Sequence, residues 1–172
     1  MHLLHLLRHA KSSWKDDVED HERRLNRRGR EAARLVGEHL PAALGKLDLI
    51  LCSSAVRTRE TLALVLACFQ TRPPCLIEDD LYLAERDQLI ARLRRLDESC
   101  VNVLLIGHNP GLQQLAIALA ESDAPLARMF SSKLPTLARV SYRIETQWSG
   151  IGDMRHRLID YVTPGSLSER TN

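Results

Sequence analysis

The sequence contains no long apolar run, no large net charge and no signal-peptide pattern. No stretch approaches the roughly 18 apolar residues that a membrane-spanning helix needs, and the first residues lack a small-residue cleavage site. The formal net charge of +2 is too small for bulk attraction to nucleic acid or membranes. These absences predict a cytoplasmic protein that takes neither nucleic acid nor a membrane as its partner.

Close cysteine pairs are absent as well. The cysteines lie in apolar surroundings, and none belongs to a CxxC motif of the kind that metal and redox sites use. We therefore expect buried free thiols in a reducing compartment. The four residues are Cys52, Cys68, Cys75 and Cys100.

Internal repeats and low-complexity segments are also missing, and 172 residues, 44% of them apolar, suffice for one domain spanning residues 1–172. Strand and helix patterns alternate along this chain. Buried strands are predicted at residues 2–7, 47–53, within 72–80, and at 100–108. Helices are predicted from a cap at Asn26 to Leu44, and at 54–69, 85–96 and 110–121.

The pattern changes in the last third of the chain. Residues 137–145 and 154–162 alternate apolar and polar side chains, as half-exposed strands near a sheet edge do, with hairpin-turn residues between them. Residues from about 165 to 172 are expected to form a flexible tail. The order of elements predicts a three-layer α/β/α sandwich whose central sheet is mostly parallel, with an antiparallel strand toward the end.

Cationic and polar residues follow three of the predicted strands. Ligands of such folds bind outside the carboxyl ends of the strands, so these residues are expected to meet at one edge. Arginine forks match phosphate oxygens and helix N-termini favour anions, which predicts a site for a phosphoryl group. The residues are Arg8 and His9; Ser53, Ser54 and Arg57; and Gly107, His108 and Asn109.

The chemistry of this cluster singles out His9. Neighbouring cations disfavour protonation of an imidazole, so His9 is expected to be neutral and nucleophilic. Gly107 is expected to let the backbone approach the ligand closely. His2 and His5 lie nearby in sequence, but alternation along a strand puts them on opposite faces, so no metal or other cofactor is predicted.

Five segments together resemble the motifs of one family, the histidine phosphatase superfamily of phosphoglycerate mutase-like proteins, and within it the small SixA-type phosphohistidine phosphatases. The likeness spans roughly residues 3–167. Ala10 replaces a usual glycine, Arg24 and Ser54 each replace a usual proline, and Glu60 replaces a usual glutamine. The segments are "LLRHAKSSW", "DHERRLNRRG", "CSSAVRTRET", "LLIGHNPGL" and "KLPTLARVSY" followed by a tryptophan.

The resemblance implies a fold, an activity and roles for residues. It implies a phosphoglycerate mutase-like fold and a metal-independent phosphatase in which His9 becomes phosphorylated while Arg8, Arg57 and His108 hold the phosphate oxygens. It implies a phosphohistidine-bearing protein as the partner, such as a histidine phosphotransfer domain in signal transduction, and a site that phosphate or sulfate can occupy.

Further residues of the first loop are candidates for binding the substrate. Lys11 and Ser12 can donate hydrogen bonds to phosphate, and Arg23 matches a family position close to the site. The remaining arginines of the basic stretch can attract an acidic phosphoprotein. They are Arg24, Arg27 and Arg28.

The general acid is not identified by the pattern. Asp80 and Glu85 are the leading candidates because they follow the third predicted strand, although Glu85 is equally a first-turn carboxylate favoured by a helix dipole. Three further carboxylates lie in the first loop and can face the site. They are Asp16, Asp17 and Asp20.

The basicity of the leaving group favours one substrate class. An alkoxide must be protonated to leave, whereas imidazole, with a pKa of about 6.5 for its conjugate acid, leaves more easily. A site without a committed acid therefore suits phosphohistidine. A small-molecule phosphomonoesterase and a non-catalytic phosphate-binding module stay open as alternatives. A two-histidine RNA phosphoesterase is discounted because Lys11 and Pro110 stand where it would carry hydroxyl residues.

Overall fold

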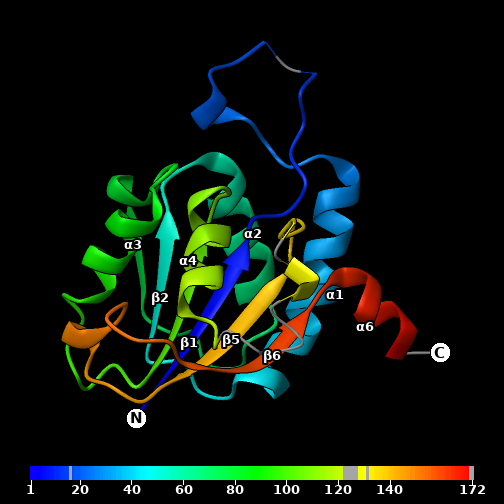
Figure 1. Ribbon diagram of the computed structural model, residues 1–172. Helices are drawn as coiled ribbons and strands as arrows, with labels where there is room; N and C mark the ends of the chain where they lie inside the picture. Colours follow the sequence, from blue (N-terminus) through cyan, green and yellow to red (C-terminus); the bar gives the residue numbers. More distant parts are fainter. Residues whose placement is uncertain (16, 122–127, 131, 171–172) are drawn as a thin grey trace.

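The structure is a computed structural model that describes residues 1–15, 17–121, 128–130 and 132–170. Its centre is a six-stranded sheet in the order β3-β2-β4-β1-β5-β6, with helices on both faces (Figure 1). The predicted α/β/α sandwich is confirmed. The strands are β1 (His2–Arg8), β2 (Leu49–Ser53), β3 (Cys75–Glu78), β4 (Asn102–Gly107), β5 (Arg139–Ile144) and β6 (Arg157–Val162).

The sheet is mostly parallel. Strand β1 pairs with β4, β4 with β2 and β2 with β3 in parallel, whereas β5 runs antiparallel to both of its neighbours, β1 and β6. The carboxyl ends of β1, β2 and β4 therefore lie at the same edge. The residues that follow these strands are brought together there, as the order of elements predicts.

Two hydrophobic cores lie on opposite faces of this sheet. Alternation along β1 sends Leu4 and Leu6 into one core and Leu7 into the other. The first core packs under α3 (Arg86–Leu93) and α4 (Gly111–Leu119), and the second under α1 (Arg27–Leu44), α2 (Val56–Leu66) and α6 (Pro164–Arg170). The described residues also form three short 3-10 helices: η1 (Asp20–Glu22), η2 (Asp79–Leu81) and η3 (Trp148–Gly150).

Helix boundaries follow the local signals closely. The Asn26 side chain accepts a hydrogen bond from the Gly29 amide at 2.8 Å, and α1 ends at Gly45 with a positive φ of 64°. Helix α4 begins at Gly111 with Pro110 at its N-cap, one residue later than predicted. No helix in the described part of the chain is long and apolar enough to cross a membrane.

Strand β5 differs from expectation because it is an interior strand. Its alternating polar residues indicated a half-exposed strand, yet Arg139 and Ser141 are buried between β1 and β6. Arg139 donates to the carboxylate of Asp160 on β6 at 2.5 Å and to the Ser141 hydroxyl at 2.6 Å. These bonds offset the cost of burying polar groups, so the alternation reports a buried polar network rather than exposure to solvent.

The end of the chain and the thiols also differ in part from expectation. Residues 164–170 form α6 instead of a flexible tail, because Leu167 is buried in the core beside α1. Residues 171–172 lie outside the described residues. All four cysteines are free, but Cys52 alone is buried and the other three are half-buried.

The polar network of β5 extends to His5 on β1. Asn102 donates its amide hydrogens to two backbone carbonyls, so its Oδ1 accepts the proton of His5 Nε2 at 2.9 Å. Nδ1 of His5 then accepts from the Ser141 hydroxyl at 2.8 Å. Burial and the charge of Arg139 lower the pKa of His5 to about 4, and the network is complete only when the imidazole is neutral.

We expect the stability of the protein to fall as the pH drops from about 6.5 to about 4. Over this range the unfolded chain binds a proton at His5 that the folded protein does not, which is worth about 3 kcal/mol for this residue. In urea denaturation at a series of pH values, His5→Gln should show a shallower loss of stability. Equal slopes for wild type and His5→Gln would contradict the prediction.

Candidate active site

A cavity of about 320 Å³ lies at the carboxyl edge of the sheet. The segment between β1 and α1 extends beyond this edge (Figure 1). The cavity collects residues from the carboxyl ends of β1 and β4, from the loop between β1 and α1, and from the first turn of α2. Asp20, Trp14, Leu83, Asn109 and Thr136 line it as well. The predicted site residues that it brings together are Arg8, His9, Lys11, Ser12, Arg23, Arg57 and His108.

His9 follows directly after β1 and is only 8% exposed. Its Nδ1 lies 2.7 Å from the Ala10 carbonyl oxygen, and because a carbonyl can only accept, Nδ1 carries the proton and Nε2 carries the lone pair. Burial lowers the pKa of His9 to about 4, assisted by the charges of Arg57 and Arg8 and opposed by the bond to Ala10. The ring is therefore neutral at pH 7, with one nitrogen able to act as a nucleophile.

His108 follows β4 and lies beside His9, with 5.2 Å between the ring centroids. Its Nε2 lies 2.7 Å from the hydroxyl oxygen of Ser53, at the end of β2. The Ser53 hydroxyl can donate to this nitrogen, which leaves a proton on Nδ1, and Nδ1 has no partner among the described residues. Burial and the nearby His9 and Arg57 lower the pKa of His108 to about 3. A ligand oxygen would satisfy the buried Nδ1–H.

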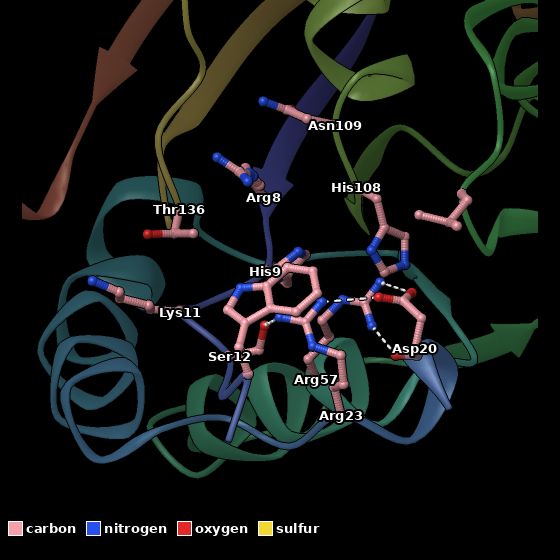
Figure 2. A pocket seen from close by; sticks show the side chains of 12 residues that line it. Arg8, His9, Lys11, Ser12, Asp20, Arg23, Arg57, His108, Asn109 and Thr136 are labelled. Atoms are coloured by element: carbon pink, nitrogen blue, oxygen red, sulfur yellow. Dashed lines mark hydrogen bonds and ion pairs between the residues drawn. The ribbon is translucent and has the colours of Figure 1, made fainter. Parts of the chain in front are cut away.

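Arg57 and Arg23 are held by one carboxylate, that of Asp20 in η1 (Figure 2). Arg57 donates to Asp20 Oδ2 at 2.9 Å and to the Asp20 carbonyl at 2.6 Å, and Arg23 donates to Oδ1 at 2.8 Å. The Tyr82 hydroxyl donates to Oδ2 at 2.7 Å. Partial burial opposes the shift, but these hydrogen bonds hold the pKa of Asp20 well below its ordinary value. Asp20 thus orients the arginines as a permanent anion.

Arg8 is positioned from the opposite side of the cavity. Its Nη1 donates to the Leu134 carbonyl at 2.8 Å, and the Asn109 amide donates to the same oxygen at 3.0 Å. The Arg8 Nε has no partner among the described residues, although it is buried. Arg8, Arg23 and Arg57 thus give the cavity more positive charge than Asp20 offsets, which suits a dianion.

Gly29 allows two backbone segments beside the site to pack closely, while the role of Gly107 toward a ligand stays a prediction. A Cβ on Gly107 would meet only leucine side chains, at 3.4 Å or more, in ordinary contact. A Cβ on Gly29 would lie 2.1 Å from the Lys11 carbonyl oxygen, which also accepts from the Asn26 amide at 3.0 Å. Gly29 therefore allows the loop that follows His9 to pack on the start of α1.

The predicted acids, Asp80 and Glu85, do not line the cavity. Asp80 lies at a separate surface hollow with Arg92 and Arg95, and Glu85 precedes α3, where its amide donates to the Gln88 side chain at 2.8 Å. Asp17 is exposed and does not line the cavity, and Asp16 lies outside the described residues. The placement of Asp80 and Glu85 gives no support to a role as general acid.

Sequence patterns did not single out Asp20 or Tyr82 as parts of the site. Asp20 was one of several loop carboxylates, and the signal that separates it is its spacing of three residues before Arg23, which matches their ion pair. Tyr82 follows η2, and its link to Asp20 spans 62 positions in sequence. No local pattern reports a contact of that range.

Together the fold and the site define a class of protein, an α/β sandwich with a cationic cavity built around a neutral histidine. The model of the histidine phosphatase superfamily (branch 1) matches residues 4–88. The chain is also 34% identical over 161 residues to the uncharacterized protein Rv1276c of Mycobacterium tuberculosis, a match that covers 92% of this chain and 99% of that protein. The chain belongs to the histidine phosphatase superfamily, and hence to the phosphatases.

Solved structures agree with this assignment. The SixA protein of Agrobacterium tumefaciens is 27% identical, with a TM-score of 0.81 over 95% of this chain and 98% of that chain. The protein histidine phosphatase SixA complexed with tungstate has a TM-score of 0.77 at 23% identity, over 96% of this chain and 99% of that chain, and shows the same fold. Structures of small-molecule phosphatases share the fold at lower identity.

We expect His9 and His108 to remain neutral far below the usual range for histidine. In an NMR titration of the free protein with labelled histidine rings, both should titrate at or below about pH 4, because burial and the arginines oppose the charged form. His9 should show a proton on Nδ1 at pH 7. A His9 titration near pH 6.5, or a proton on Nε2, would contradict the geometry described here.

Proposed function

We propose that this protein removes the phosphoryl group from phosphohistidine on a phosphoprotein, through a phosphorylated His9 and without a metal ion. The observation that carries the proposal is the hydrogen bond from His9 Nδ1 to the Ala10 carbonyl, among three arginines. It leaves the lone pair on Nε2 at the phosphoryl-binding cavity. A neutral, oriented imidazole is what nucleophilic attack on phosphorus needs.

The reaction then proceeds in two displacements. Nε2 of His9 forms a bond to phosphorus as the bond from phosphorus to the substrate ring breaks, and that ring, protonated on its other nitrogen, leaves as neutral imidazole. Water next attacks phosphorus, the bond to His9 breaks, and inorganic phosphate leaves. Arg8, Arg57 and the Nδ1 proton of His108 stabilise the negative charge on the three equatorial oxygens.

The state of Asp20 favours a substrate with a nitrogen leaving group. It is the one acidic side chain among the described residues that line the cavity, and its hydrogen bonds keep it ionised. An ionised carboxylate cannot protonate a departing alkoxide. Imidazole leaves without such help far more readily, because its conjugate acid has a pKa of about 6.5.

The mouth of the cavity favours a protein as the carrier of the phosphohistidine. Only residues 79–85 separate β3 from α3, so no lid stands at this side of the site. A protein surface can therefore reach His9. The free cysteines are consistent with work in a reducing compartment such as the cytoplasm.

Replacement of the central residues tests the chemistry. His9→Ala should abolish turnover of a phosphohistidine protein, and Arg57→Ala should lower kcat by roughly 100-fold or more, because each removes charge or nucleophile from the transition state. Arg59→Ala, exposed on the same helix, serves as the matched control and should stay near the wild-type rate. Near-normal turnover by His9→Ala would contradict the assignment of His9 as the nucleophile.

Substrate preference tests the leaving-group argument. With a chelator present, kcat/KM should be higher for a phosphohistidine protein than for a panel of phosphomonoesters, and Asp80→Asn and Glu85→Gln should leave it unchanged. The opposite preference, with a large loss in one carboxylate variant, would make the protein a small-molecule phosphomonoesterase. A stable phosphoryl group on His9 that water does not remove would make it a phosphate-binding module.

A further inference from the structure

A second hollow of about 540 Å³ lies beside the catalytic cavity, between the loop after His9 and the first turn of α1. We call it the basic groove. Its lining includes Lys11, Trp14, Lys15, Asn26, Arg27 and Arg28. We propose that the basic groove docks an acidic segment of the substrate protein next to its phosphohistidine, an inference that rests on the proposed function.

The groove is continuous with the site of the chemistry. Lys11, Ser12 and Trp14 line both the groove and the catalytic cavity. A polypeptide that places a phosphohistidine at His9 can therefore continue directly into the groove. A free phosphorylated amino acid would leave the groove empty.

The charge of the groove is local and of one sign. Four of its lining residues are cations, and none of the described residues that line it is acidic. Arg27 donates to Glu31 one turn along α1, so that Lys11, Lys15 and Arg28 supply most of the uncompensated charge. The whole chain has a net charge of only +2, so the groove is a distinct patch. Such a patch is complementary to carboxylates.

Trp14 forms the wall between the two hollows and is 80% exposed. The guanidinium carbon of Arg23 lies 3.2 Å from the centroid of its ring, and Arg23 is fixed by bonds to Ser12 and to the Ser13 carbonyl. The indole is thus supported from below while its outer face remains open to solvent. Exposed Trp residues beside arginine are typical of the centres of protein interfaces.

A polypeptide is favoured over RNA as the occupant. Indole rings and cations also bind single-stranded RNA, but such sites track the backbone through extended grooves with a positive charge at each step. Here the cations form one short patch that ends at a cavity built for a phosphoryl group on histidine. Inhibition of the hydrolysis of a phosphohistidine protein by single-stranded RNA distinguishes the two occupants.

The test uses the full chain and compares its activity on two substrates. The first is a phosphohistidine protein that carries Asp and Glu beside the phosphohistidine, and the second is free phosphohistidine. Arg28→Glu and Lys15→Glu alter the groove but not the catalytic cavity. Each should lower kcat/KM for the protein by about tenfold, mainly through KM, and change it by less than about twofold for the free amino acid. Arg34→Glu makes the same charge change on an exposed part of α1 outside the groove, and should behave as wild type with both substrates.

Salt dependence gives a second readout. The wild-type kcat/KM for the protein should fall as the ionic strength rises from about 50 to about 300 mM, and that for Arg28→Glu should fall less. Three results would overturn the proposed docking role of the basic groove. They are an equal loss of kcat/KM with both substrates in Arg28→Glu and Lys15→Glu, no loss in these variants, and the same loss in Arg34→Glu. Single-stranded RNA would be the ligand of the groove if it inhibited the wild type competitively, if Arg28→Glu abolished this inhibition, and if Arg28→Glu left kcat/KM for the phosphohistidine protein unchanged. Failure of the wild type to hydrolyse either substrate would instead overturn the proposed function.

Discussion

The parallel pairing of β1 with β4 is the constraint on which the site depends. Its register places Arg8 opposite Gly107, so the two histidines that follow, His9 and His108, leave the sheet at adjacent strand ends. The His9 amide donates to the Gly107 carbonyl at 3.2 Å and extends this ladder into the site. A slip of one residue would turn every side chain of β1 to the other face, so the same apolar alternation that fills the two cores also fixes the position of His9.

The second constraint is the burial of like charges. Arg57 is 3% exposed and Arg23 is 7% exposed, and both line the same cavity as Arg8. Asp20 makes this arrangement possible because it neutralises part of the charge and fixes the direction of two guanidinium groups. The same bonds keep Asp20 from acting as an acid. Structural support for the arginines and the proposed preference for a good leaving group thus have one physical cause.

Much of the fold was predictable because its signals are local. Asn26 and Gly45 bound α1 through a side-chain cap and a positive φ, and the apolar runs of β1, β2 and β4 reflect strands that are buried on both faces. The failures were at positions decided by distant partners. The alternation in β5 was read as exposure to solvent, because nothing near Ser141 or Arg139 in sequence reveals that His5 bonds the Ser141 hydroxyl and that Asp160 pairs with Arg139. The helix α6 likewise depends on a core contact of Leu167.

By itself, the sequence determined which residues stand at the ends of the strands, and the chemistry of those residues predicts a ligand that carries a phosphoryl group. The tertiary structure decided the rest of the site: that Asp20 rather than Asp80 or Glu85 enters the cavity, and that Trp14 divides it from a basic groove. The reason is physical. Backbone hydrogen bonding and side-chain alternation act over a few residues, whereas the partner of a buried charge is chosen by packing among groups that lie far apart along the chain.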